Sequence, residues 1–262
     1  MSRTIVFLTD YGLADGFVGV CHGVIGRIAP DARVIDLTHQ VVRQDVLGGA
    51  ITLARSTRFM PDDAVYLAVV DPGVGSERRP IAVETRAGAA LVGPDNGLLS
   101  MTWSELGGAE RAVEVSAPEV LLHPVSRTFH GRDVFAPAAA HLAAGLALED
   151  LGPPVALDQL HVVDLPAPMV TPGSVGARVV AVDGFGNVQL NATAAELEAA
   201  GLGPTLAIGA RDVPRVATFA EVSFGACGAI VDSEGFVALV VNHGSAAQLL
   251  GLSVGDPVVL AG

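Results

Sequence analysis

The chain contains no lysine, and all 15 of its basic residues are arginine. Without lysine it cannot form a Schiff base with a carbonyl substrate, and it cannot bind phosphate through the lysine of a P-loop. The chain has only two cysteines, Cys21 and Cys227, which lie far apart in the sequence. This spacing predicts neither a zinc knuckle nor a disulfide framework, so we expect both to be small buried residues.

Long apolar segments are missing as well. No run approaches the roughly 18 apolar residues of a membrane span, and the first residues lack the apolar core and cleavage site of a signal peptide. The net charge of −13 argues against nucleic acid and anionic membranes as partners, but it tolerates a cationic ligand. Half of the 262 residues are hydrophobic and 16% are charged, which is typical of a globular protein. We expect a cytoplasmic location.

Strand-like and helix-like segments alternate through the first part of the chain. Short apolar runs at Thr4–Leu8, Val34–Leu37 and Ala64–Val70 predict strands, and residues 16–28 and 45–60 between them have helical spacing. This alternation predicts an α/β domain with a mostly parallel sheet. The last of the three strands is almost entirely apolar, which is typical of a strand that is buried on both faces.

The composition changes after Gly152. Five prolines interrupt residues 153–172, which predicts a connection between two domains. Short strands separated by glycine-bearing turns follow, and they predict a small β-barrel or sandwich. We therefore expect an α/β domain at residues 1–165, a linker at 166–175 and a smaller, all-β, barrel-like domain at 176–262.

The segment Asp71–Arg79, with the sequence DPGVGSERR, follows the buried strand directly. Asp beside Pro favours a turn, and Gly73 and Gly75 allow backbone angles that a side chain would forbid. Ligands of an open α/β sheet bind beyond the carboxyl ends of its strands, so a carboxylate and a guanidinium here are placed to contact a ligand. The residues alone leave a second interpretation equally open, in which Asp71 caps a turn and both arginines are solvated.

Other polar residues occupy comparable positions. Asp10 follows the first strand, Asn96 lies in the turn GPDNG, and His130 precedes an alanine-rich helix with Gly131 beside it. Each also has an ordinary structural interpretation, because polar turns are common and a lone histidine is usually structural. The turn Asp183–Asn187 combines an acid, an aromatic ring and an amide, but by itself it is typical of a hairpin. Pattern alone does not name a reaction.

Six motifs together point to one family. They are TDYG (Thr9–Gly12), DPGVGSERR (Asp71–Arg79), GPDNG (Gly93–Gly97), TFHGRDVFAPAAA (Thr128–Ala140), DGFGN (Asp183–Asn187) and SEGF (Ser233–Phe236). With these motifs in this order, nearly the whole chain resembles the S-adenosylmethionine hydroxide adenosyltransferases, which are relatives of fluorinase and chlorinase. The resemblance implies an enzyme that binds S-adenosylmethionine and lets water, as hydroxide, attack the ribose C5′, releasing adenosine and L-methionine. It also implies an α/β domain followed by a β-barrel, and a homotrimer whose active sites lie between one subunit's first domain and its neighbour's second.

The family's functional residues fall on matching positions. Its catalytic Asp–Arg–His triad falls on Asp71, Arg78 and His130. The expected substrate contacts are Asp10 for the ribose, Asp183 for the methionine amino group, Phe185 and Asn187 for the adenine, Ser233 for the methionine carboxylate, and Asn96 in GPDNG. One departure is Glu234, where the fluorinase has an arginine that reaches the carboxylate; recognition there is expected to rest on Ser233 or on backbone N–H groups. Arg79 beside Arg78 leaves open which guanidinium faces the water.

The residue types suit this chemistry. A sulfonium departs as a neutral thioether without help from an acid, so the difficulty lies in the nucleophile. A His–Asp pair can orient or deprotonate a water, and an arginine favours hydroxide by Coulomb attraction. We expect neither a metal nor a cofactor, and no His/Cys/Asp/Glu cluster has metal-ligand spacing in the sequence.

Two alternatives to a hydrolase remain open. A non-catalytic sensor of S-adenosylmethionine or adenosine would not need the Asp71, Arg78 and His130 set, which is complete here. A halogenase is less favoured, because halogenating relatives lack the acid and the histidine of this triad. We therefore expect hydrolysis of S-adenosylmethionine.

Overall fold

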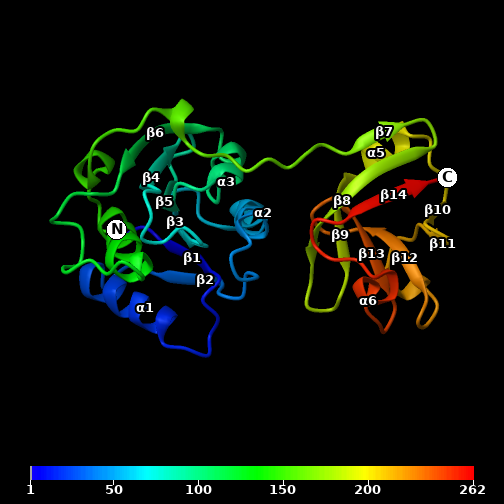
Figure 1. The fold of residues 1–262 in the computed structure, drawn as a ribbon, viewed down its shortest axis with the longest axis horizontal. Coiled ribbons are helices and arrows are strands. Elements are labelled where there is room, and N and C mark those ends of the chain that lie inside the picture. Colours follow the sequence, from blue (N-terminus) through cyan, green and yellow to red (C-terminus); the bar gives the residue numbers. More distant parts are fainter. Residues whose placement is uncertain (1) are drawn as a thin grey trace. The chain divides into compact units, whose positions relative to one another are not determined.

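The computed structural model describes residues 2–262, which form two compact units (Figure 1). The first unit ends at Asp164, and the second comprises Leu165–Gly262. Part of the expected linker, residues 166–175, is taken up by strand β7 (Met169–Thr171) and by the first residues of β8 (Ser174–Val182).

The first unit alternates strands and helices, as expected. Its elements are β1 (Ile5–Thr9), α1 (Phe17–Ile28), β2 (Val34–Thr38), α2 (Val46–Ser56), β3 (Val65–Val69), β4 (Pro80–Thr85), β5 (Ala90–Pro94), α3 (Ser100–Glu105), β6 (Ala109–Glu114) and α4 (Ala136–Ala143). The strands form one six-stranded sheet in the order β2-β1-β3-β5-β4-β6. The pairs β1–β2, β1–β3 and β3–β5 are parallel, while β4 pairs antiparallel with β5 and β6. The predicted α/β fold is confirmed.

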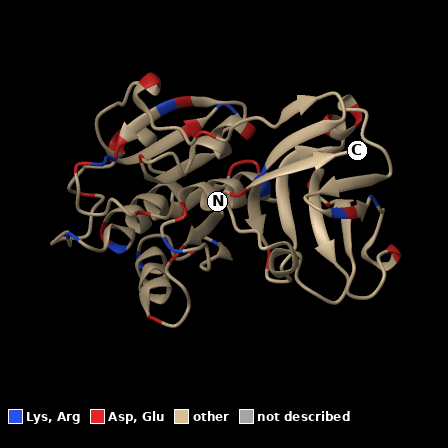
Figure 2. Cartoon of the chain, turned by 45° about the vertical axis from the view of Figure 1, so that its right-hand side comes forward, with Lys and Arg blue, Asp and Glu red and all other residues tan. Residues whose placement is uncertain are grey.

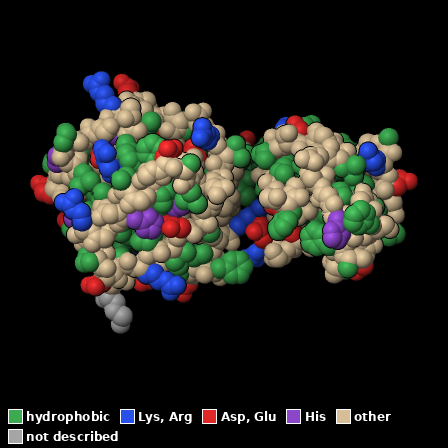
Figure 3. Space-filling view, turned by 90° about the horizontal axis from the view of Figure 1, so that it is seen from below, with side chains coloured by type: hydrophobic (Ala, Val, Ile, Leu, Met, Phe, Trp, Pro, Cys, Tyr) green, Lys and Arg blue, Asp and Glu red, His purple; other side chains and the backbone are tan. Residues whose placement is uncertain are grey.

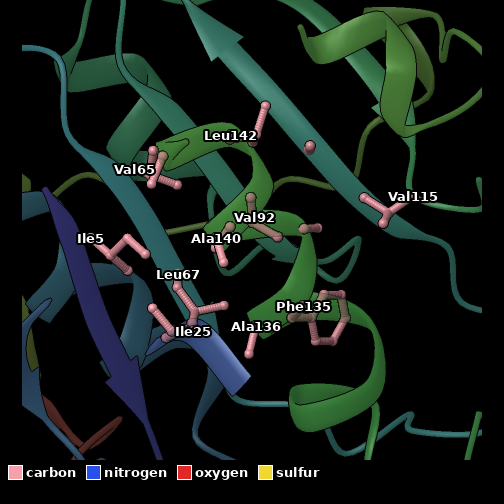
Figure 4. Packing of buried hydrophobic residues seen from close by; sticks show 14 of the residues in the cluster. Ile5, Ile25, Val65, Leu67, Val92, Val115, Phe135, Ala136, Ala140 and Leu142 are labelled. Carbon is pink, nitrogen blue, oxygen red and sulfur yellow. The ribbon is translucent and has the colours of Figure 1, made fainter. Parts of the chain in front are cut away.

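The sheet of the first unit has a core on each face, and this explains its unbroken apolar strands. On one face Ile5 and Leu67 pack with helices α1 and α4, as Figure 4 shows with Phe135 and Ala140. On the other face the alternate residues, Tyr66 among them, pack with α2 and α3. Because successive side chains of a strand point to opposite faces, a strand covered on both faces must be apolar throughout.

The second unit is an antiparallel, barrel-like sheet, as predicted. Its remaining elements are β9 (Val188–Thr193), α5 (Ala194–Ala199), β10 (Thr205–Ile208), β11 (Arg211–Pro214), β12 (Cys227–Val231), β13 (Phe236–Val241), α6 (Ala246–Leu250) and β14 (Pro257–Ala261). The strand order is β11-β10-β14-β8-β9-β13-β12, and β7 pairs with β8 outside this path. An isolated bridge between Arg215, just beyond β11, and Ala229 of β12 brings the two edges of the sheet together. The sheet therefore curves into a nearly closed barrel around its own apolar core.

Charged residues are spread over both units (Figure 2). Strands β1, β3 and β5 at the centre of the first sheet carry none. On the face drawn in Figure 3, acidic and arginine side chains are interspersed with hydrophobic ones. Among the described residues, no helix has both the length and the apolar character that crossing a membrane requires. Cys21 is buried, Cys227 is half-buried, and both are free thiols.

Candidate active site

Two acids follow the carboxyl ends of two adjacent strands of the first sheet. Strands β1 and β3 pair in parallel with Thr9 opposite Val69, so their carboxyl ends lie at the same edge. Asp10 follows β1 at once, and Asp71 follows β3 after Val70. Both acids border one cavity of about 150 Å³. Parallel pairing therefore turns two separate sequence motifs into one polar site.

Arg78 joins Asp71 to His130. Its Nε donates to Asp71 Oδ1 at 3.0 Å and to Oδ2 at 3.1 Å, and its Nη2 donates to Oδ2 as well. The same Nη2 lies 2.9 Å from Nδ1 of His130. The guanidinium carbon also lies over the buried Phe135 ring, 5.1 Å from its centre, which is a cation–π contact. Of the three residues predicted as a triad, Arg78 thus contacts both of the others and links them.

A short loop and a widened helical turn position His130. Asp133 accepts hydrogen bonds from the backbone N–H of Ser126 at 2.9 Å and from Nε of Arg132 at 2.6 Å, which closes the loop that precedes the histidine. His130 then begins a π-helical turn (Gly131–Phe135) that continues into α4. Turns of this kind are frequent at functional sites, but no sequence pattern predicted this one.

The electrostatics of the site favour a neutral imidazole. The side chains of Arg78 and Asp71 are only 9% and 6% exposed, so the ion pair is poorly screened by water. Arginine can only donate, so Nδ1 of His130 must accept, and a neutral ring then carries its proton on Nε2. Burial and the nearby Arg78 charge lower the pKa of His130, while Asp71 and Asp133 partly oppose them. The ring therefore stays neutral near neutral pH and presents one N–H donor.

Three aromatic residues that were not predicted as site residues also line this cavity. Tyr11, Phe17 and Phe129 contact one another with ring centres 5.2–5.9 Å apart, and all three border the cavity. A Cβ atom at position 131 would lie 1.9 Å from the Tyr11 hydroxyl, so Gly131 leaves the room that this hydroxyl fills. Burial raises the pKa of Tyr11 well above its usual value, so it remains a neutral phenol. Tyr11 and Phe129 lie inside the TDYG and TFHGRD motifs, and this position in the sequence was the one indication that they belong to the site.

The structure separates the two neighbouring arginines. Arg79 donates to Oδ2 of the buried Asp95 from Nε at 3.0 Å and from Nη2 at 2.5 Å, and Nη2 also donates to the carbonyl of Gln159 at 2.5 Å. Arg79 therefore ties the loop around residue 159 to the sheet, and Arg78 is the arginine that contacts Asp71 and His130.

Asn96 braces the end of a strand. Its Nδ2 donates to the carbonyl of Val70 at 2.9 Å, and its Oδ1 accepts from the backbone N–H of Leu98 at 3.1 Å. The Nδ2 end of the amide thus holds the backbone directly before Asp71, and the Oδ1 end holds the turn that contains Asn96 itself. The expected contact of Asn96 with substrate stays a prediction.

In the second unit, Asp183 organises the DGFGN turn. Its Oδ1 accepts from the backbone N–H groups of Phe185 and Asn187, both at 2.9 Å, and its Oδ2 accepts from Asn187 Nδ2 at 2.7 Å. The Phe185 ring is 83% exposed, which is unusual for a large apolar residue. The turn therefore presents an aromatic surface from a rigid base.

The SEGF motif forms the turn between β12 and β13. Gln189 Nε2 donates to Glu234 Oε2 at 3.2 Å and also to Asp232. The Gln189 amide therefore holds the Glu234 carboxylate in place. Ser233 lies in the same turn. Two larger hollows of the second unit, of about 510 and 540 Å³, have neither an acid nor a histidine among the residues described as lining them. The acids of this unit that match the family motifs, Asp183 and Glu234, lie in its turns.

Comparison with known sequences places these features in a family. Residues 5–152 match the SAM hydroxide adenosyltransferase N-terminal domain, and residues 177–259 match the corresponding C-terminal domain. The chain belongs to the SAM hydroxide adenosyltransferase family. The resemblance inferred from the six motifs is therefore confirmed.

Relatives of this family cover nearly the whole chain. An (R)-S-adenosyl-L-methionine hydrolase of Salinispora arenicola is 51% identical over 96% of this chain and 95% of its own length, and one of Thermus thermophilus is 42% identical over 98% and 99%. A fluorinase of Nocardia brasiliensis is 30% identical over 97% and 95%. Among solved structures, a conserved protein of Thermotoga maritima superposes with a TM-score of 0.90 at 35% identity, covering 98% of this chain and 100% of that one.

Proposed function

We propose that this chain hydrolyses S-adenosyl-L-methionine by attack of hydroxide at the ribose C5′, giving adenosine and L-methionine. The observation that carries the proposal is that Arg78 bonds to both Asp71 and His130, and that Asp71 and His130 border one cavity together with Asp10. The relatives named as hydrolases, at 51% and 42% identity, support the choice of substrate. The nucleophile is proposed to bind beside the triad, in line with the bond from C5′ to sulfur.

In this proposal the triad holds hydroxide rather than water. Arg78 supplies a charge that does not titrate near neutral pH, and the neutral His130 supplies an Nε2–H donor. Both groups favour an anionic oxygen over a neutral one. Asp71 keeps Arg78 in position through its paired hydrogen bonds and partly balances its charge. Buried donors aimed at a negative charge are worth far more than the same donors in water.

The leaving group needs no catalytic assistance from the protein. A sulfonium departs as a neutral thioether, so the bond from C5′ to sulfur breaks without a proton donor, and one proton is released for each water consumed. For this reason the proposed reaction needs neither a metal nor a cofactor. A cytoplasmic location and the lack of a nucleic-acid partner stay predictions.

The substrate is proposed to bind between two subunits of a homotrimer. Asp10 would hold the ribose beside the triad, while Asp183, Phe185, Asn187 and Ser233 of a neighbouring chain would contact methionine and adenine. The cavity in the first unit, about 150 Å³, supports this proposal because sites for comparable ligands occupy about 300–1,000 Å³. The exposed Phe185 ring supports it as well, since a stacking partner for adenine must be accessible.

The function is tested by incubating the pure protein with S-adenosylmethionine in ¹⁸O-labelled water. We expect equal amounts of adenosine and L-methionine, with one ¹⁸O atom on the 5′-oxygen of adenosine by mass spectrometry. Formation of 5′-chloroadenosine when chloride is present would instead indicate a halogenase. Saturable binding of S-adenosylmethionine without any product would indicate a sensor.

The triad is tested with a matched pair of variants. Asp71→Asn removes the charge that holds Arg78, and we expect kcat to fall at least about 10²-fold, the usual scale for loss of a group that prepares the nucleophile. Asp158→Asn makes the same change at an exposed position and should leave kcat unchanged. Adenosine binding, measured by calorimetry, should persist in both variants. An equal kcat in the Asp71→Asn and Asp158→Asn variants would show that Asp71 has no role in the mechanism.

A further inference from the structure

Three potential metal ligands that are not part of the triad converge in the first unit. They are His22 on α1, Asp36 on β2, and His39 just beyond the end of β2. His22 Nε2 lies 2.8 Å from Asp36 Oδ1, and His39 Nε2 lies 3.0 Å from the same oxygen. The three ligand atoms lie within 4.8 Å of one another. Sequence spacing gave no sign of this cluster, because folding brings its members together from separate elements.

His39 carries the argument for a ligand. Its side chain is only 3% exposed, and its Nε2 lies 3.0 Å from Asp36 Oδ1 without making a hydrogen bond of good geometry to any described residue. The short distance to Asp36 thus lacks the geometry of a hydrogen bond. A buried nitrogen without a well-formed hydrogen bond is costly, and this one lies within 4.8 Å of both other ligand atoms. An ion between the three would satisfy it.

The other nitrogen of the same ring is already fixed. His39 Nδ1 lies 2.9 Å from Oγ1 of the buried Thr9, and the Phe7 ring packs edge-on against the imidazole at 4.7 Å. Metal-bound histidines nearly always hydrogen-bond through their second nitrogen, which orients the ring and sets its tautomer. Thr9 supplies that contact, so His39 is held with Nε2 toward His22 and Asp36.

We propose that His22, Asp36 and His39 form a binding site for one divalent transition-metal ion, for which Zn²⁺ is the best fit. Ligand atoms around tetrahedral Zn²⁺ lie about 3.3 Å apart, because each is about 2.0–2.2 Å from the ion. The two separations from Asp36 Oδ1, 2.8 and 3.0 Å, are slightly shorter than that value, and the two imidazole nitrogens lie no more than 4.8 Å apart. Two imidazoles and one carboxylate select such ions over Mg²⁺ and Ca²⁺, which prefer oxygen ligands.

The site is accessible from solvent. The side chains of His22 and Asp36 are 34% and 45% exposed, so an ion can enter from their side while His39 forms the buried wall. Three protein ligands leave a fourth position for water. The carboxylate and the overall net charge of −13 both favour a cation.

The ion would brace the edge of the sheet that carries the candidate active site. Thr9 Oγ1, which contacts His39, also accepts the backbone N–H of Tyr11 at 3.2 Å, and Asp10 lies between these two residues. The ion itself takes no part in the proposed hydrolysis. Its role is to hold the ends of β1 and β2 against α1.

The test measures metal binding directly, without the hydrolysis assay. Protein without a polyhistidine tag is stripped with a chelator, desalted and titrated with Zn²⁺ by calorimetry. Co²⁺ is followed in parallel by its visible absorption, which is intense in four-coordinate sites and weak for the hydrated ion. We expect one ion per chain for both metals, and Zn²⁺ should raise the midpoint of thermal unfolding. Absence of saturable binding would overturn the proposal whether or not the chain hydrolyses S-adenosylmethionine.

Variants then place the ion. His22→Gln and Asp36→Asn change partly exposed residues, so both variants should fold. We expect each to weaken Zn²⁺ binding at least about 100-fold. Loss of a residue that only hydrogen-bonds to a metal ligand typically weakens binding about 10–100-fold. His243→Gln makes the histidine change in the second unit and should bind Zn²⁺ as the wild type does. Circular dichroism without metal checks the fold of each variant. Equal Zn²⁺ affinity in all four proteins would place the ion elsewhere and overturn the assignment.

Discussion

Arg78 occupies the central position among the residues of the candidate site. It bonds to Asp71 through two nitrogens and to His130 through one of them, while Phe135 packs on its face. Because arginine offers only donors, it dictates which nitrogen of His130 carries a proton. One guanidinium thereby holds the acid and determines which nitrogen of the neutral imidazole carries the proton.

This arrangement predicts an unusually acidic His130. Burial and the Arg78 charge lower its pKa below the ordinary 6.5, so the unfolded chain takes up this proton first on acidification. The stability that depends on neutral His130 is therefore complete above about pH 6.5 and declines as the pH falls below that value. Titration followed by NMR of the histidine ring should give a value under 6.5 in the wild type.

Two variants should move this value in opposite directions. Arg78→Gln removes a charge that lowers the pKa, so the pKa of His130 should rise, whereas Asp71→Asn removes a charge that raises it, so the pKa should fall. A wild-type value at or above 6.5, or shifts of the same sign in both variants, would contradict the proposed electrostatics.

At the scale of elements, two loops must approach closely to form the triad. The loop after β3 contains Gly75 at φ +78°, and a Cβ atom there would lie 2.4 Å from the carbonyl oxygen of Arg127, just before His130. Only glycine provides both the left-handed backbone and the missing side chain at this contact. The second glycine of the DPGVGSERR motif is therefore a packing requirement between the loops that carry Arg78 and His130.

Gly75→Ala should consequently lower activity as well as stability. A matched control is Gly88→Ala, because Gly88 also has a positive φ, +91°, but has no atom within 4 Å of the position a Cβ would take. Backbone strain alone should cost Gly88→Ala about 1–2 kcal/mol in urea unfolding while its kcat is unchanged. Gly75→Ala should lose more stability and should also lose kcat, because the displaced loop carries Arg78. Identical losses in the two variants would show that the contact with Arg127 is unimportant.

The elements also show why sequence reasoning succeeded in some places and failed in others. Buried strands such as β3 were predicted because an unbroken apolar run is the direct result of a sheet covered on both faces. β6 was missed because it is an edge strand that carries Glu110 and Arg111. Neither the π-helical turn after His130 nor the cluster around His39 has a local signature, since each depends on packing between distant segments.

The sequence also left the roles of two adjacent arginines undecided. The sequence could not distinguish Arg78 from Arg79, because both belong to the same motif. The structure separates them because they lie directly before β4, where successive side chains point in opposite directions. One therefore reaches Asp71 and the other reaches Asp95.

At the scale of the whole molecule, the proposed chemistry is divided between two units. The first carries the triad and Asp10 at the edge of a parallel sheet, and the second carries the rigid turn that exposes Phe185. In the proposed trimer each active site takes its first unit from one chain and its second unit from the next. A defect in one unit can then be complemented by a different defect in the other.

Mixed trimers of two inactive variants test this division. Asp71→Asn damages the first unit, and Phe185→Ala damages the second by removing an exposed ring that contributes little to the fold. The two are co-expressed with different tags, and complexes that carry both tags are purified. In a ring of three, either mixed composition contains one site with two intact halves, so about one third of wild-type activity should return at low substrate concentration. If each site lay within a single chain, every site would carry one of the two defects, and mixing would restore nothing.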